Sequence, residues 1–311
     1  MRAFIFPGQG SQSVGMGVAL AGASAVARET FQEVDEALGQ HLARLMAEGP
    51  ADELMLTENA QPAIMANALA TLRVLEREGG VRLADKAEYV AGHSLGEYSA
   101  LCAADAVKLA ETARLLRTRG QAMQAAVPVG AGAMAALLGL DFAAARQIAA
   151  DAAEGQVCEA ANDNAPGQVV VSGDRAAVER AVELAKVRGG KRAMLLPVSA
   201  PFHCALMEPA ARAMEKALAS AALSAPLVPL YANVTAAPVA DPAAIRTLLV
   251  EQVTGTVRWR ESVEAMAAAG VDHFVEFGGK VLGPMVKRIA PDAVATSVVT
   301  MDDIEALAKA L

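Results

Sequence analysis

The stretch VAGHSLGEYSALCAADAV, residues 90–107, is the most informative part of the chain. It places Ser94 between Gly92 and Gly96, after an apolar strand pattern and before an apolar helix pattern. A turn that runs from a strand straight into a helix is tight, so small residues must flank the side chain at its apex. In that context the Gly-x-Ser-x-Gly pattern predicts a nucleophilic serine at Ser94, carried by a parallel α/β sheet.

The rest of the chain alternates between strand and helix patterns in the same way. Strands are expected at residues 2–6, 88–93, 229–233 (PLYAN) and 272–277 (DHFVEF), and helices at 96–104 and 107–126. Such alternation is typical of a parallel sheet covered by helices.

The middle of the chain follows a different order. It predicts strand 132–139, helix 141–154, strands 156–162 and 167–172, helix 174–189 and strand 192–198. This βαββαβ order is the ferredoxin-like split motif. Because the chain ends of a domain often lie close together, a small domain can be inserted into a larger one. We therefore expect a large α/β domain formed by residues 1–128 and 199–311, and an inserted ferredoxin-like domain formed by residues 129–198.

Composition narrows the class of protein. A chain of 311 residues that is 54% hydrophobic can bury a sizeable core. The net charge is −8, and no basic stripe or zinc-ligand spacing occurs, so nucleic acid is not an expected partner. No run of about 18 apolar residues occurs, so no membrane span is expected. Cys102, Cys158 and Cys204 are widely spaced and odd in number, which indicates no disulfide framework and favours a cytoplasmic location.

A serine hydroxyl needs a general base, and the chain offers four histidines. His41 lies in the helical pattern ALGQHLARL and is expected at the surface. His93 adjoins Ser94, but neighbouring side chains on a strand point opposite ways, so we expect it to support the turn. His203 follows prolines on a loop before a helix, which is a common place for catalytic groups. His203 is therefore the preferred base, and His273 at the head of a strand is the alternative.

The glycine-rich segment FPGQGSQ, residues 6–12, directly follows the first strand. It lacks the Lys-Ser/Thr pair of a phosphate loop and the glycine spacing of a dinucleotide site. A second interpretation is that its turn aims the backbone N–H of Gln9 at an oxyanion. The N–H of Leu95, at the start of the helix after Ser94, would be the partner donor. The pattern alone leaves this segment ambiguous.

Arg119 lies in LLRTRGQAM, toward the end of a predicted helix. An arginine at a helix end is commonly a solvated partner of the helix dipole. If Arg119 is instead buried near Ser94, its guanidinium could bind a carboxylate through two parallel hydrogen bonds.

Seven segments taken together resemble the malonyl-CoA:acyl carrier protein transacylases of type II fatty acid synthesis. They are FPGQGSQ, QPAIMANALA, GHSLGEYSAL, RGQAMQ, NDNAPGQVVVSG, SAPFHCALM and GGKVLGPMVKR. They occur in order and cover nearly the whole chain. The resemblance implies a hydrolase-like α/β core with a small ferredoxin-like insert. It also implies ping-pong transfer of a malonyl group from malonyl-CoA to acyl carrier protein, with coenzyme A released and with no cofactor or metal.

The resemblance further implies a role for individual residues. The nucleophile falls on Ser94, the general base on His203, and the malonate-binding arginine on Arg119. The histidine is oriented by main-chain carbonyls instead of an aspartate, and one of these falls on Gln252.

By the same resemblance, the backbone amides of Gln9 and Leu95 form the oxyanion hole. Phe202 before the histidine and the aliphatic Leu95 after the serine fit related domains that prefer malonyl over methylmalonyl. The chain departs from the family at Gly278-Gly279-Lys280, where one residue is missing from a Gly-x-Gly-Lys turn. The local geometry of that loop is therefore expected to differ.

Two other functions fit parts of the sequence. An esterase or thioesterase of the α/β-hydrolase class would use the chain order Ser94, Asp241, His273, although it gives no role to the insert or to Arg119. A non-catalytic protein that docks a carrier would tolerate the loss of Ser94. Hydrolysis of a simple aryl ester tests the first alternative, and covalent labelling by malonyl-CoA tests the second.

Docking of an acidic carrier protein onto a chain with a net charge of −8 needs a local basic patch. The densest candidate is KVRGGKR, with Lys186, Arg188, Lys191 and Arg192. An ordinary solvated run of charge is the alternative interpretation of this segment.

Overall fold

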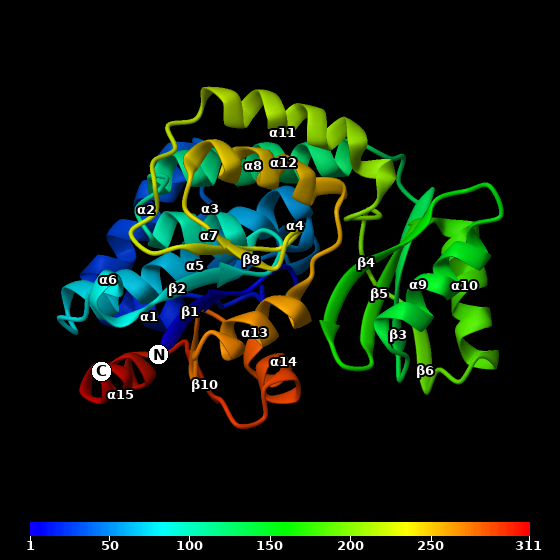
Figure 1. The fold of residues 1–311 in the computed structure, drawn as a ribbon. Coiled ribbons are helices and arrows are strands. Elements are labelled where there is room, and N and C mark those ends of the chain that lie inside the picture. The colour runs from blue at the N-terminus through cyan, green and yellow to red at the C-terminus, as the bar shows by residue number, and fades with distance from the viewer.

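A computed structural model describes residues 1–311 and contains two sheets, each with its own helices (Figure 1). The larger sheet has the strand order β10-β9-β1-β2-β7-β8, and the smaller one has the order β4-β5-β3-β6. The strands are β1 (Arg2–Phe6), β2 (Tyr89–Gly92), β3 (Gly132–Leu138), β4 (Cys158–Ala165), β5 (Gln168–Asp174), β6 (Arg192–Leu195), β7 (Leu230–Ala232), β8 (Ala237–Val239), β9 (His273–Phe277) and β10 (Val294–Val298).

Helices cover both sheets and connect their strands. They are α1 (Val18–Ala23), α2 (Ala25–Leu38), α3 (Leu42–Glu48), α4 (Ala51–Met55), α5 (Thr57–Arg77), α6 (Leu83–Lys86), α7 (Gly96–Ala103), α8 (Leu109–Ala125), α9 (Phe142–Ala153), α10 (Arg175–Val187), the short 3₁₀ helix η1 (Ala205–Met207), α11 (Glu208–Ser220), α12 (Pro242–Thr254), α13 (Trp259–Ala268), α14 (Leu282–Ile289) and α15 (Met301–Ala310). None of them combines the length and the apolar character needed to cross a membrane.

The larger sheet is parallel except at one edge. β1 pairs with β2 and β9, β2 pairs with β7, and β9 pairs with β10, all in parallel, whereas β8 joins β7 antiparallel. Strands covered on both faces read as continuous apolar runs, which explains the pattern of β1. The carboxyl ends of β1 and β2 meet at one edge, where parallel α/β sheets usually bind ligands. The turn that holds Ser94 leaves β2 at this edge.

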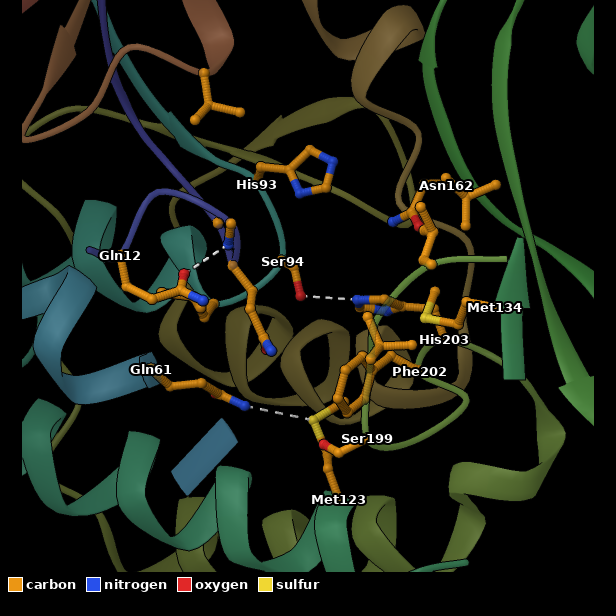
Figure 2. A pocket seen from close by; sticks show the side chains of 18 of the residues that line it. Gln12, Gln61, His93, Ser94, Met123, Met134, Asn162, Ser199, Phe202 and His203 are labelled. Atoms are coloured by element: carbon orange, nitrogen blue, oxygen red, sulfur yellow. Dashed lines mark hydrogen bonds between the residues drawn. The ribbon is translucent and has the colours of Figure 1, made fainter. Parts of the chain in front are cut away.

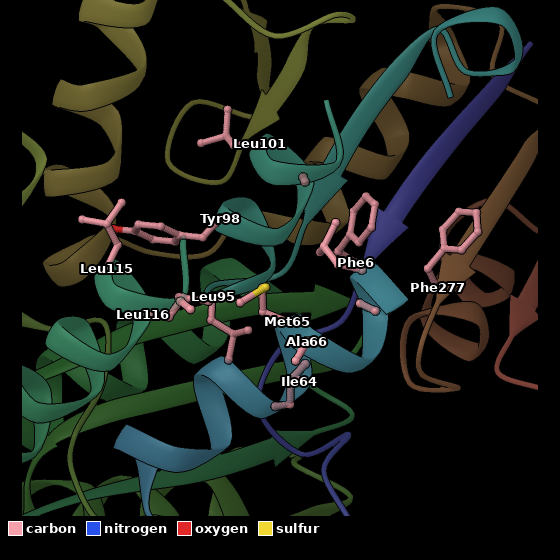
Figure 3. Packing of buried hydrophobic residues seen from close by; sticks show 14 of the residues in the cluster. Phe6, Ile64, Met65, Ala66, Leu95, Tyr98, Leu101, Leu115, Leu116 and Phe277 are labelled. Atoms are coloured by element: carbon pink, nitrogen blue, oxygen red, sulfur yellow. The ribbon is translucent and has the colours of Figure 1, made fainter. Parts of the chain in front are cut away.

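The core fixes the elements on either side of that turn. Phe6 of β1, Met65 of α5, Tyr98 of α7 and Leu116 of α8 belong to one buried cluster (Figure 3). Because protein interiors pack at the density of organic crystals, α7 and α8 have little freedom to move relative to β1.

The smaller sheet shows how alternating residues divide between two cores. Ala133, Ala135 and Leu137 of β3 pack with α9 and α10, whereas Met134 belongs to the core of the larger sheet. Successive side chains of a strand point to opposite faces, so this sheet is buried on both sides. The observed order β3-α9-β4-β5-α10-β6 confirms the predicted βαββαβ order.

The two sheets are joined through β4. Asn162 forms an isolated parallel bridge with Val257, and Asp163 N donates to Val257 O at 2.9 Å. The buried carboxylate of Asp163 forms a 2.8 Å salt bridge with Arg260 of α13. These contacts hold β4 against the start of α13, so the space between the sheets has fixed walls.

Two local predictions were wrong. The strand expected over 192–198 ends at Leu195, since Pro197 cannot donate to a ladder. His41 does not lie inside a helix. Gly39, at φ 59°, ends α2, and His41 precedes α3 in an exposed position.

Candidate active site

The turn at Ser94 depends on close backbone approach. A Cβ atom at Gly92 would lie 1.9 Å from the carbonyl group of Gly96, and one at Gly96 would lie 2.3 Å from Phe6 O. Ser94 itself has φ 54°, in the left-handed region that non-glycine residues rarely adopt. Backbone strain of this kind persists only where the surroundings impose it, and it clusters at functional sites.

Ser94 and His203 form a hydrogen-bonded pair. Figure 2 shows Ser94 Oγ next to His203 Nε2, at 2.7 Å. His203 Nδ1 lies 2.9 Å from the carbonyl oxygen of Gln252, so Nδ1 carries the proton and Nε2 is left as the acceptor. Burial, and after it the charge of Arg119, lower the pKa of His203 from its usual 6.5 to about 3. The imidazole is therefore neutral near pH 7, as a general base must be.

Arg119 reaches the same hydroxyl from α8. Its Nη2 atom donates to Ser94 Oγ at 3.1 Å and to Gln252 Oε1 at 2.8 Å, and its Nη1 donates to Gln61 Oε1 at 2.8 Å. The side chain is 1% exposed, so the solvated helix-end interpretation is wrong. The next residue, Gly120, explains the burial: a Cβ atom there would lie 2.5 Å from Glu58 Cα, so α8 packs directly against the start of α5.

Two residues that line the cavity beside Ser94 have a free backbone N–H group. The N–H groups of Gln9 and Leu95 have no acceptor within the protein, and both residues line the cavity in front of Ser94. The Gln9 side chain is held by Thr57, whose Oγ1 donates to Gln9 Oε1 at 2.9 Å. Leu95 immediately precedes α7, where the helix dipole favours negative charge. Together the two amides could serve as an oxyanion hole.

A cavity of about 620 Å³ lies between the two sheets in front of Ser94. His203 lines one side together with Met134 and Asn162 of the smaller sheet, and Gln12 and Gln61 line the other (Figure 2). Its volume is typical of sites that bind small organic ligands. His93 Nε2 lies 2.7 Å from Asn164 Oδ1, so His93 ties the turn to the smaller sheet.

The alternative triad is not assembled. His273 is the first residue of β9 and pairs in register with Arg2 at the start of β1, so it lies at the edge of the sheet opposite Ser94. Its Nε2 lies 2.9 Å from Thr296 Oγ1. Asp241 caps α12 by accepting from Ala244 N at 2.8 Å. These contacts leave no role for Asp241 and His273 as acid and base for Ser94.

Sequence reasoning missed three buried polar residues around the turn, namely Gln61, Glu97 and Asn233. Asn233 Oδ1 accepts from Ser94 N at 2.8 Å, and Asn233 N donates to Glu97 Oε1 at 2.9 Å. A signal for Glu97 was present, because it is the one charged residue of the otherwise uncharged segment GEYSALCA. A charge is costly to bury unless it is hydrogen-bonded, so a charge in such a helix deserves a search for partners.

Side chains hold the turn at residues 278–280. Asn67 Nδ2 donates to Gly278 O at 2.9 Å. The buried carboxylate of Glu276 accepts from Val281 N at 2.8 Å and from Leu282 N at 3.0 Å. Val281 and Leu282 line the cavity, so this turn contributes a fixed part of its wall.

Acidic neighbours partly neutralise the basic patch that was predicted to dock a carrier protein. Lys186 pairs with Glu183 at 2.6 Å, and Arg188 pairs with Asp151, which offsets half of the charge in the basic patch. No three His, Cys, Asp or Glu side chains converge in a group that could hold a metal ion.

Comparison with known proteins gives consistent matches over nearly the whole chain. Residues 3–280 match the acyl transferase domain family. The malonyl CoA-acyl carrier protein transacylase of Salmonella typhimurium is 48% identical over 296 residues, which cover 95% of this chain and 94% of that one. The protein of the same name from Escherichia coli is 47% identical over 310 residues, which cover 99% of this chain and 98% of that one.

Solved structures agree with this. The acyl-carrier-protein-S-malonyltransferase of Bartonella henselae superimposes with a TM-score of 0.97 at 54% identity, over 99% of this chain and 98% of that one. A malonyl-transacylase in complex with its type II PKS acyl-carrier protein superimposes with a TM-score of 0.96 at 40% identity, over 100% of this chain and 99% of that one.

Proposed function

This chain belongs to the acyl transferase family of the malonyl CoA-acyl carrier protein transacylases, and from that premise we propose that it transfers malonyl groups through an ester on Ser94. The malonyl group comes from malonyl-CoA and goes to the phosphopantetheine thiol of an acyl carrier protein. One observation carries the mechanism: Ser94 Oγ lies 2.7 Å from His203 Nε2 and 3.1 Å from Arg119 Nη2. A nucleophile, its base and a cation suited to a carboxylate thus meet at a single oxygen atom.

The first half-reaction loads the serine. Ser94 Oγ attacks the thioester carbonyl carbon of malonyl-CoA while its proton passes to His203 Nε2. The carbonyl oxygen becomes negative and accepts the N–H groups of Gln9 and Leu95. When the intermediate collapses, the carbon–sulfur bond breaks, and His203 returns the proton to the sulfur of coenzyme A. The imidazolium that forms in between is held by the carbonyl oxygen of Gln252.

The second half-reaction reverses these roles. The thiol of the carrier protein gives its proton to His203, and its sulfur attacks the ester carbonyl carbon. The same two amides stabilise the oxyanion. The bond between carbon and Ser94 Oγ then breaks, and Ser94 recovers the proton from His203. The free enzyme is regenerated, and no cofactor takes part in either step.

Arg119 supplies selectivity for a dicarboxylic acyl group. Its hydrogen bonds in the free protein all go to neutral acceptors. An incoming malonyl carboxylate is a stronger acceptor than any of these, and a guanidinium can meet both of its oxygens. The carboxylate also opposes the Arg119 charge that lowers the pKa of His203. Malonyl binding therefore makes the base more basic, whereas an acetyl group does not.

The architecture supports a finer description of the fold. The strand order β4-β5-β3-β6, with α9 and α10 on one face, supports a ferredoxin-like domain over residues 129–198. The parallel sheet with a serine turn after β2 supports a hydrolase-like domain formed by residues 1–128 and 199–311. Hydrogen exchange would test this division, because residues 129–198 should open as one unit.

The three free cysteines favour a cytoplasmic location.

The direct test is covalent loading without a carrier protein. Incubation with malonyl-CoA should raise the intact mass of the wild type by one malonyl group, located on the peptide that contains Ser94. Acyl carrier protein should then remove the label. Ser94→Ala should gain no mass, whereas Ser99→Ala, a buried serine of α7 outside the cavity lining, should load like the wild type. A malonylated Ser94→Ala protein would overturn the assignment, and rapid loss of the label to water alone would favour the esterase.

A further inference from the structure

Gln252 contacts the groups that the proposed mechanism uses, through its backbone and through its side chain. The backbone carbonyl oxygen faces His203 Nδ1 at 2.9 Å. Its Oε1 accepts from Arg119 at 2.8 Å, and its Nε2 donates to Ser94 O at 2.9 Å. The same Nε2 also donates to the carboxylate of Glu97. Gln252 is completely buried, so no water competes for these contacts.

The two ends of the Gln252 amide are alike in shape but opposite in hydrogen bonding. Arg119 can only donate, so the oxygen end must face it. An ionised Glu97 can only accept, so the NH₂ end must face it. The reversed orientation would place the NH₂ group against the guanidinium and the oxygen against the carboxylate, and it would be strongly disfavoured. Glu97 therefore makes one of the two orientations far more stable than the other.

Glu97 is itself fixed within a ring of hydrogen bonds. Its Oε1 accepts from Asn233 N at 2.9 Å. Asn233 Oδ1 accepts from Ser94 N at 2.8 Å, and Gln252 closes the ring through Ser94 O at 2.9 Å. The ring surrounds the backbone of Ser94, whose φ is 54°. A change at Glu97 is therefore transmitted to Gln252 and to the nucleophile.

The arrangement keeps two buried charges apart. Glu97 is 2% exposed and Arg119 is 1% exposed, but the amide of Gln252 lies between them. A direct salt bridge would occupy the guanidinium with an internal carboxylate, which would compete with the carboxylate of a substrate. Burial raises the pKa of Glu97 to about 7, while Asn233, Gln252 and the charge of Arg119 oppose that rise. At pH 8 the carboxylate is ionised, and its charge interacts with Arg119 and with the neutral phenol of Tyr98.

We propose that Glu97 is a positioning residue for malonyl selectivity. Its carboxylate fixes the orientation of the Gln252 amide, and that orientation holds Arg119 beside Ser94 with its guanidinium free of any internal carboxylate. This inference rests on the proposed function.

The test compares the loading of Ser94 by malonyl-CoA and by acetyl-CoA at pH 8, followed by intact mass after rapid quenching. Glu97→Gln presents an NH₂ group to Gln252, so the Gln252 amide turns and Arg119 loses its acceptor. Malonyl loading should fall roughly tenfold to a hundredfold, as expected for losing a hydrogen bond to a charged group, and acetyl loading should fall much less. Glu97→Asp retains a carboxylate and should recover part of the malonyl-to-acetyl ratio.

A matched control separates this role from burial of a charge in general. Glu276 is another fully buried carboxylate, but it accepts from the backbone of residues 281–283 and from Ser297, and it does not contact Gln252. Glu276→Gln should therefore keep the wild-type ratio, even where loosening of the turn at residues 281–283 lowers stability or lowers both loadings alike. An equal fall in malonyl and acetyl loading in Glu97→Gln would overturn the proposal, because it would assign Glu97 a purely structural role.

Failure of the proposed function gives a different result. A wild type that neither thioester loads would contradict the proposed function. The assignment of Glu97 would then be decided by a crystal structure of Glu97→Gln. Displacement of the Arg119 guanidinium from Gln252 supports the assignment, and an unmoved guanidinium overturns it. If Glu97→Gln does not fold, Glu97→Ala takes its place, and an unchanged malonyl-to-acetyl ratio in that variant contradicts the proposal.

Discussion

The turn around Ser94 and the four-stranded sheet are both well buried, but they are built in opposite ways. At the turn, Ser94 and His203 have φ values of 54° and 59°, and buried polar side chains surround them. The helix-facing core of the four-stranded sheet instead consists of apolar side chains and Cys158. Strained backbone and buried polar groups persist only where many contacts impose them. The difference indicates that the chemistry belongs to the turn, and that the smaller sheet provides one wall of the cavity.

The largest effect on rate should come from removing the general base, His203. His203→Ala should slow malonyl transfer by about 10²–10⁴-fold, the usual contribution of a positioned general base. His273→Ala should have little effect, since His273 lies at the opposite edge of the sheet. Steady-state rates with malonyl-CoA and acyl carrier protein measure both. A larger loss in His273→Ala than in His203→Ala would reverse the assignment of the base.

A substitution in the core of the smaller sheet should lower the stability of the protein and leave its chemistry unchanged. Val171 of β5 is completely buried among the residues that face α9 and α10. Val171→Ala removes two methyl groups from this core and should lower the free energy of unfolding by roughly 1–3 kcal/mol. The malonyl-to-acetyl ratio should stay at the wild-type value. Urea denaturation and thioester loading check the two parts, and a changed ratio without a loss of stability would contradict the division of roles.

The pH dependence of stability should distinguish the titratable groups of the turn. Burial raises the pKa of Glu97 from 4.5 to about 7, so its contribution to stability is present below pH 4.5 and lost as the pH rises to about 7. His203 acts in the opposite sense. Its pKa falls from 6.5 to about 3, so its contribution is present above pH 6.5 and lost as the pH falls.

The two contributions oppose each other over much of this range, so a variant isolates one of them. Glu97→Gln lacks the carboxylate and should gain free energy of unfolding relative to the wild type between pH 5 and pH 8. Urea denaturation at both values measures the gain. An equal difference between variant and wild type at the two pH values would show that Glu97 has an ordinary pKa.

The sequence was sufficient for the features that depend on local pattern. The glycines around Ser94, the alternation of strands and helices and the βαββαβ order are all set by neighbouring residues, and the elements formed within a few residues of where they were expected. His203 could be preferred because the chain has only four histidines and one lies on a loop between a proline and a helix.

Features that depend on tertiary packing were not accessible in the same way. Burial of Arg119 follows from the close approach of α8 to α5 at Gly120, which no local pattern encodes. Glu97, Asn233 and Gln252 are far apart in the sequence, and only the folded chain brings them together. Their polar character gave a reason to ask for partners but not the identity of those partners.

The central claim is that Arg119 is the cation that receives the malonyl carboxylate beside Ser94. Loading of the protein by malonyl-CoA and by acetyl-CoA tests it in Arg119→Ala and in Arg117→Ala, a matched control whose guanidinium points to Glu58 O and Asn59. In Arg119→Ala, malonyl loading should lose roughly 2–5 kcal/mol of transition-state stabilisation, while acetyl loading stays level or rises. Arg119→Lys should recover only part of the loss, because an ammonium cannot form the two parallel hydrogen bonds. An equal fall in malonyl and acetyl loading in Arg119→Ala would contradict the claim and leave Arg119 a structural residue.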